Sequence, residues 1–88
     1  MNKIVVSVKA APNFMLLLEF EGKEYRVFDF KAYAETKSGF PLEIIKNRVL
    51  FESVRIDGTG TISWDNDFDI DVEFLYNNSI AKSDSDFD

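Results

Sequence analysis

The 88-residue sequence contains no cysteine and no histidine. The absence of cysteine excludes disulfides, thiolate catalysis and cysteine metal sites, and it is typical of proteins kept in a reducing cytosol. The absence of histidine removes the commonest general base and the commonest metal ligand. The longest apolar run, residues 14–18, is far too short to cross a bilayer, and residues 1–4 do not resemble a signal peptide. We therefore expect a cytoplasmic protein that has no membrane segment, no cofactor or metal, and no catalytic activity.

Positive charge is scarce, because 10 Lys and Arg residues stand against 16 Asp and Glu residues, which gives a net charge of −6 at pH 7. The basic residues are scattered, and an acidic chain without a basic patch is repelled by phosphate backbones. We therefore expect no direct binding of nucleic acid and, instead, a protein partner that is itself basic. Aromatic residues are abundant, with nine Phe, three Tyr and one Trp. Such large side chains suit the core of one small domain.

Alternating apolar residues predict three antiparallel strands over residues 4–10, 14–21 and 24–30. The first strand places three apolar side chains on one face: Ile4, Val6 and Val8. The second strand is apolar on both faces at its start, which is typical of a central strand. Gly22 supplies the positive φ of the tight turn between the second and third strands. The pattern of the third strand is less regular, and it indicates a β-bulge near residues 26–27.

The middle of the chain predicts short helical turns and one hairpin. A helical turn is expected over residues 31–37, and Ser38-Gly39-Phe40-Pro41 ends it. Three apolar residues beyond it are expected to be buried: Leu42, Ile44 and Ile45. Asn47 is a favourable N-cap for the short helix that follows. Apolar residues at alternate positions over residues 54–57 and 61–64 flank two glycines, which predicts a hairpin.

The last part of the chain predicts an irregular segment, a helix and a tail. Asp71 fits the N-cap of a C-terminal helix, and Ile70 and Leu75 have the spacing of a hydrophobic staple around that cap. Residues 79–88 are polar and acidic, so we expect a disordered tail there. The prediction is a single α+β domain over residues 1–78, with a mainly antiparallel sheet of about five strands. The sheet combines a three-strand meander with a hairpin, and short helices and the C-terminal helix accompany it.

Acidic residues occupy every second position before and into the last helix: Asp65, Asp67, Asp69, Asp71 and Glu73. An EF-hand loop that begins at Asp65 needs Gly at its sixth position and Glu at its twelfth. Those positions hold Ile70 and Tyr76, so the match fails, and only a looser oxygen site for a cation is left open. A more ordinary explanation is a solvated turn beside a core Trp64, which shares a strand face with Ile62. The remaining acids form a possible interaction surface for a basic partner: Asp65, Asp67, Asp69 and Glu73.

Several short motifs follow one another in a specific order: Pro12-Asn13-Phe14, Leu17-Leu18-Glu19-Phe20, Val27-Phe28-Asp29-Phe30, Phe40-Pro41-Leu42, Phe51, Val54-Arg55-Ile56-Asp57 and Trp64-x-Asn66-x-x-Asp69-Ile70-Asp71-x-Glu73-x-Leu75-Tyr76. Together they resemble the small bacterial proteins of domain-of-unknown-function family two-four-four-two over residues 3–77, and the last motif is the most specific. Two positions depart from the usual pattern of that family, which has Gly at the place of Asp67 and often Pro at that of Val72.

The resemblance implies an α+β fold with a mainly antiparallel sheet and no established activity. It also implies that some members continue into a helix-turn-helix and that others are encoded beside another small protein. We therefore expect a non-catalytic, antitoxin-like or regulatory module that binds a small basic partner encoded nearby. The alternative is a transcription-related domain that acts through a helix-turn-helix partner, and a metal-binding or hydrolytic enzyme is a third hypothesis. Unpaired sheet edges leave a homo-oligomer open.

Overall fold

The computed structural model describes residues 3–83 and contains two small antiparallel sheets. The first sheet has the order β1-β2-β3-β7, and its strands are β1 (Val5–Ala11), β2 (Met15–Phe20), β3 (Glu24–Asp29) and β7 (Ile80–Lys82). The second has the order β4-β5-β6, and its strands are β4 (Arg55–Ile56), β5 (Ile62–Ser63) and β6 (Asp69–Ile70). The helical elements are the 3₁₀ turn η1 (Pro12–Phe14) and the helices α1 (Phe30–Glu35), α2 (Phe40–Ile45), α3 (Arg48–Phe51) and α4 (Val72–Asn77).

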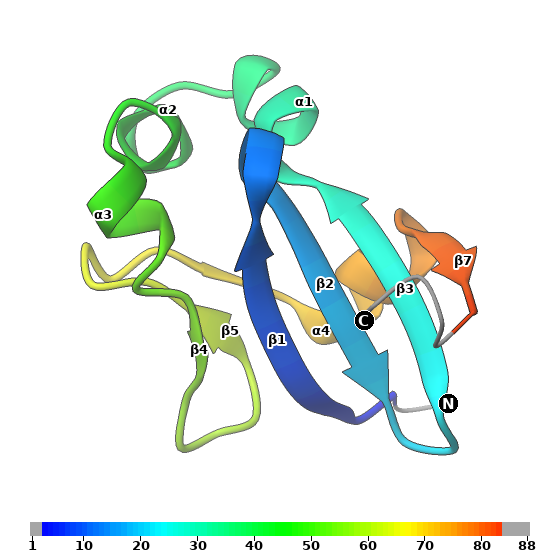
Figure 1. Ribbon diagram of the computed structural model, residues 1–88. Coiled ribbons are helices and arrows are strands. Elements are labelled where there is room, and N and C mark those ends of the chain that lie inside the picture. The colour runs from blue at the N-terminus through cyan, green and yellow to red at the C-terminus, as the bar shows by residue number, and fades with distance from the viewer. Residues whose placement is uncertain (1–2, 84–88) are drawn as a thin grey trace.

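This architecture confirms the α+β class, with the predicted meander in β1–β3 and the predicted hairpin in β4–β5. The structure contains two strands, β6 and β7, in addition to the five that the sequence predicts. Figure 1 shows α1, α2 and α3 at one end of the first sheet, and α4 behind β2 and β3. Among residues 3–83, no helix has the length and apolar character that crossing a membrane requires.

The core lies between the first sheet and the elements behind it. Leu16, Leu18 and Phe20 alternate along β2 and are fully buried, which confirms the predicted face and the central place of this strand between β1 and β3. The ring of Phe20 meets that of Tyr76, on α4, at a centroid distance of 5.1 Å. Burial of such side chains is the main favourable contribution to folding, at roughly 1.5–3 kcal/mol for each large apolar group.

The apolar face predicted for the first strand is wrong at its beginning. Val5 is 6% exposed, whereas Ile4 and Val6 are 52% and 48% exposed. The register with β2 shifts between Val5 and Ser7, and such a β-bulge moves the following side chains to the other face. The bulge predicted in the third strand is also wrong, because β2 and β3 pair without interruption.

Three short helices follow the meander. Helix α1 confirms the predicted turn, and the carboxylate of Asp29 caps it by accepting a hydrogen bond from the backbone N–H of Ala32 at 3.0 Å. Helix α2 was not predicted, because Gly39-Phe40-Pro41 has the composition of a helix end. Pro41 instead occupies the first turn of α2, where its missing N–H has no partner to lose. The predicted cap at Asn47 is confirmed, since its Oδ1 accepts from the N–H of Leu50 at 3.2 Å.

The predicted cap of the last helix is confirmed, because Oδ2 of Asp71 accepts from the N–H of Phe74 at 3.0 Å. The prediction of an irregular segment before this helix is partly wrong, since β6 pairs with β5 through Ile62↔Ile70. The disordered tail expected over residues 79–88 is wrong at its start, because Ile80–Lys82 forms β7 beside β3. β7 pairs with the edge of β3 from Val27↔Ile80 to Tyr25↔Lys82, although the Ile80 side chain stays 67% exposed. Residues 84–88 of the predicted tail lie outside the described part of the chain.

Candidate functional site in the Trp64–Phe68 turn and the hollow beside it

Trp64 is completely buried at the end of the second sheet. Its indole Nε1–H donates a hydrogen bond to the carbonyl oxygen of Phe51 at 3.1 Å, and its ring lies 4.8 Å from that of Phe30. A buried indole usually needs such a partner for its N–H. The prediction of a core tryptophan is therefore confirmed, and Trp64 joins the second sheet to α3 and α1.

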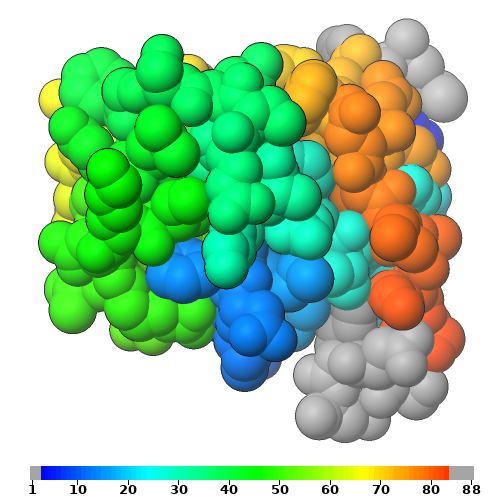
Figure 2. All heavy atoms as spheres, turned by 90° about the horizontal axis from the view of Figure 1, so that it is seen from above, coloured from blue at the N-terminus to red at the C-terminus, as the bar shows by residue number. Residues whose placement is uncertain are grey.

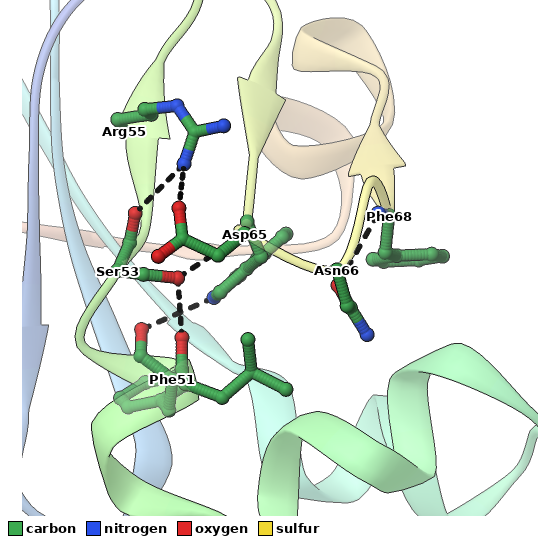
Figure 3. Close-up of polar contacts among 8 residues, drawn as sticks. Phe51, Ser53, Arg55, Asp65, Asn66 and Phe68 are labelled. Carbon is green, nitrogen blue, oxygen red and sulfur yellow. Dashed lines mark hydrogen bonds and ion pairs between the residues drawn. The ribbon is translucent and has the colours of Figure 1, made fainter.

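The chain after Trp64 is held by Ser53 and Arg55, as Figure 3 shows. The hydroxyl of Ser53 accepts from the N–H of Asp65 at 3.0 Å and donates to the carbonyl oxygen of Leu50 at 2.6 Å. Nη1 of Arg55 donates to Oδ1 of Asp65 at 2.7 Å and to the carbonyl oxygen of Ser53 at 3.3 Å. Asp65 is exposed but already paired, so its charge is partly compensated within the chain.

The turn is completed by Asn66 and Asp67. Asp67 has a φ of 68°, in the left-handed region where Gly is easiest and Asp or Asn is tolerated, and its N–H donates to the carbonyl oxygen of Trp64 at 3.1 Å. The Asn66 side chain accepts from the N–H of Phe68 at 3.3 Å. Its Nδ2 donates to the carbonyl oxygen of Phe40 at 3.4 Å and to Oε1 of Glu43 at 3.2 Å. Asn66 therefore ties the turn to the first residues of α2.

A surface hollow of about 790 Å³ lies where the turn, the end of α1 and the beginning of α2 meet. Its lining consists of Tyr33, Thr36, Lys37, Ser38, Gly39, Phe40, Pro41 and Phe68. Figure 2 shows the face of the molecule on which α1, α2 and α4 lie next to one another. Phe40 is 54% exposed, so its ring presents apolar surface to solvent at the hollow.

The aromatic wall of the hollow consists of Tyr33, Phe40 and Phe68, and two of these rings contact aromatic residues of the core or next to it. Tyr33 packs against Phe74 at 5.6 Å and against Phe28 at 5.7 Å between ring centroids. Phe68 packs against Trp64 at 5.7 Å. Partial burial raises the pKa of the Tyr33 hydroxyl above its ordinary value of 10.0. These contacts hold the rings of Tyr33 and Phe68 in place, because rings packed at this spacing have few alternative positions.

The four predicted interaction residues do not gather at one point. Asp65 and Asp67 lie in the turn, and Asp69 lies exposed on β6 opposite Ser63. Glu73 lies in the first turn of α4, where it borders a second hollow of about 480 Å³. Within residues 3–83, no group of three or more acidic side chains is placed to hold a metal ion. Asp67 and Asp69 are the neighbours of Phe68 along the chain, but neither lines the first hollow, where the charged lining residue is Lys37.

The second hollow lies beside the β4–β5 turn. In that turn Oδ1 of Asp57 accepts from the N–H of Thr59 at 2.8 Å, from its hydroxyl at 2.7 Å and from the N–H of Thr61 at 3.1 Å. These bonds, with the hydroxyl of Thr59 first, lower the pKa of the exposed Asp57 carboxyl below its ordinary value. The carboxylate therefore serves the turn itself.

The sequence patterns indicate the acidic residues of this region as a possible interaction surface, but they do not indicate Phe40. Phe40 was assigned to a helix end, and only the position of α2 brings it next to Phe68, 28 residues later in the chain. The sequence feature that could have indicated this position is Gly39, directly before Phe40. Its φ of 77° is a backbone conformation that glycine adopts easily, and the chain enters α2 through it.

Comparison with protein families gives one finding. The family described as "Protein of unknown function (DUF2442)" matches residues 5–81. The match covers most of the chain, with the turn, the second sheet and all but the last residue of the first sheet, so the chain belongs to this family. Comparison with curated proteins and with solved structures gives no match.

Proposed function

We propose that this member of the DUF2442 family is a non-catalytic module that binds another protein. The observation that carries the proposal is the hollow lined by Tyr33, Phe40 and Phe68, in which Phe40 is 54% exposed. Exposed aromatic side chains grouped around a concave surface are typical of protein interfaces, where they supply most of the binding energy. Ring contacts to the core hold Tyr33 and Phe68 in place before binding, and Asn66 holds the backbone of Phe40, which lowers the entropy cost of association.

The negative net charge of the chain supports the proposal that the partner is basic. The chain carries a net charge of −6, and the acidic residues Asp67 and Asp69 lie exposed on either side of Phe68 along the chain. Opposite charges at an interface mainly increase specificity and association rate. An antitoxin-like or regulatory role, in which this protein covers a small basic partner encoded nearby, is the form of the proposal that best fits these features.

The proposal is tested by purifying the tagged full chain at native expression level from its source. We expect one protein to co-elute in size-exclusion chromatography, and we expect Phe40→Ala to reduce its recovery strongly. Val49→Ala is the matched control, because Val49 lies on α3 and is 79% exposed without touching the hollow. The proposal is wrong if the chain elutes alone, or if both variants retain the partner equally.

A further inference from the structure

The two faces of the first sheet differ in what covers them. The inner face carries Leu16, Leu18 and Phe20, which are fully buried, and the ring of Phe20 packs against α4. Figure 1 shows α4 behind the sheet and no helix or strand of residues 3–83 in front of β2 and β3. The side chains of β1, β2, β3 and β7 that point away from α4 therefore form a surface, which we call the outer face.

Strand register arranges the outer face in three rows. The middle row crosses all four strands and consists of Lys9, Leu17, Val27 and Ile80. On one side of it lies a row of Ala11, Met15 and Asp29. On the other side lies a row of Ser7, Glu19, Tyr25 and Lys82. Side chains of paired residues stand next to each other on the same face, so the register fixes which of them adjoin.

The middle of the outer face is apolar and separate from the core. Four of its side chains are apolar and adjoin one another: Met15, Leu17, Val27 and Ile80. Among the described residues, these four neither belong to the buried core cluster nor pack against it, and Ile80 is 67% exposed. The solvent face of an antiparallel sheet usually carries polar side chains. Adjoining apolar side chains with a polar rim are typical of an interaction surface.

The charges of the outer face balance, unlike those of the whole chain. The face carries two cations, Lys9 and Lys82, and two carboxylates, Glu19 and Asp29, whereas the chain has a net charge of −6. Two acidic copies repel each other over most of their surface, but a balanced face permits close approach and lets cations of one copy meet carboxylates of the other. Charge thus favours a second copy of this chain, and not a basic protein, at the outer face.

We infer that two copies of this chain associate through the outer faces of their first sheets. Sheets stack face to face about 10 Å apart with their strands roughly aligned. A two-fold axis lets the same surface serve both copies, so that every contact occurs twice. This inference does not rest on the proposed function, because the hollow at α1 and α2 is a different surface.

The size of the outer face indicates how strong the dimer is. A strand spacing of about 4.8 Å and a rise of about 3.3 Å per residue give the four strands a face of roughly 350 Å² in each copy. Stable complexes bury about 800 Å² on each partner. We therefore expect a reversible dimer that forms at high protein concentration.

The test is sedimentation equilibrium of the full chain from micromolar to millimolar concentration. We expect monomers at the low end, dimers at the high end and no larger species, because a two-fold interface uses the outer face up. In methyl-labelled protein, the signals of Leu17, Val27 and Ile80 are expected to shift with concentration. The signal of Val49, which lies exposed on α3, is expected to stay in place.

The apolar middle is tested with Ile80→Glu. Ile80 is 67% exposed, so the variant is expected to fold, as circular dichroism checks, and to weaken dimerisation about tenfold or more. Val49→Glu is the matched control, because Val49 is 79% exposed and lies off the outer face. Val27→Thr is a second variant that retains a strand-forming residue in β3, and it is also expected to weaken the dimer.

The charge balance is tested with Lys9→Glu, which makes the outer face negative. We expect it to weaken dimerisation several-fold, because two like-charged faces then meet. Lys46→Glu changes the net charge of the chain equally, but Lys46 lies exposed at the end of α2, so its effect is expected to be smaller. Adding Glu19→Lys to Lys9→Glu restores the balance and is expected to recover the dimer.

The inference is overturned if the chain stays monomeric at millimolar concentration, or if Ile80→Glu and Val49→Glu weaken the dimer equally. Open-ended larger species would indicate pairing of sheet edges and would also reject the outer face. Phe40→Ala separates this inference from the proposed function, because it is expected to reduce recovery of the partner and to leave the dimer unchanged. Loss of the dimer in Phe40→Ala would place the contact at the hollow and reject the outer face.

Discussion

Two acidic turns of this protein are built in opposite ways. In the β4–β5 turn, the side-chain bonds of Asp57 reach residues at most four positions away. In the Trp64–Phe68 turn, the side-chain bonds reach Phe51, Ser53 and Phe40, at sequence separations of 13, 12 and 26. The first turn supports itself, whereas the second connects α2 and α3 to the second sheet. Disturbing the second turn is therefore expected to affect the whole domain and the hollow, and disturbing the first only its own hairpin.

The largest effect is expected from Trp64→Phe. The smaller ring leaves part of a fully buried site empty, and the carbonyl oxygen of Phe51 loses the indole donor and keeps only the N–H of Val54 at 3.3 Å. We expect the free energy of unfolding to fall by about 2–4 kcal/mol, measured by urea denaturation with circular dichroism. A loss of less than about 0.5 kcal/mol, the value typical of surface changes, would show that the turn is not the joint between sheet and helices.

Asn66→Ala comes next, because it removes the bonds to Phe40, Glu43 and Phe68 while leaving the core packing in place. These bonds are partly solvent-exposed, so we expect a loss of about 1–2 kcal/mol and amide shift changes at the start of α2. Asn77→Ala, at the exposed end of α4, is the control and is expected to change stability little. Unchanged signals at Phe40 would contradict the role of Asn66 in positioning the hollow.

The stability of the β4–β5 turn is expected to depend on acidic pH through Asp57. The folded-state pKa of Asp57 lies below its ordinary value of 3.8, so its contribution to stability is present above that value and is lost as the pH falls through the lower folded pKa. We expect Asp57→Asn to remove this part of the stability loss below pH 3.8, measured by urea unfolding at a series of acidic pH values. The hollow signals at Phe40 are expected to stay unchanged, and their movement would show that the two turns are coupled.

The smallest effect is expected from the Arg55–Asp65 ion pair, although it lies in the connecting turn. Its side chains are 48% and 69% exposed, and such pairs contribute about 0.2–1 kcal/mol. A double-mutant cycle with Arg55→Gln and Asp65→Asn measures the coupling, which is expected to shrink as salt is added. The exposed Arg48–Glu52 pair on α3 serves as a comparison, and a coupling well above it would show that the turn shields its charges.

Local patterns predicted the elements that depend on neighbouring residues. The caps at Asn47 and Asp71 were found because each uses a side chain and an N–H only three residues apart. The face of β2 was found because alternation along one strand decides which side chains point inward. The resemblance to the family was likewise carried by short motifs, and the match over residues 5–81 confirms it.

Prediction failed where pairing between distant segments decides the outcome. Strand β7 has three residues and pairs with the distant edge of β3, with Ile80 opposite Val27. The bulge in β1 depends on its register with β2. The hollow needs Phe40 and Phe68 to meet through the Asn66 bridge, which no pattern within either segment records.

The amino-acid sequence by itself determined the α+β class, the acidic surface, the core tryptophan and the helix caps, because composition and short-range spacing control all of them. Only the tertiary structure decided which acids form ion pairs within residues 3–83. Asp65 is paired with Arg55, whereas Asp67 and Asp69 belong to no ion pair within the described residues. The physical reason is that charge compensation and concave shape depend on distances between segments, and folding sets those distances.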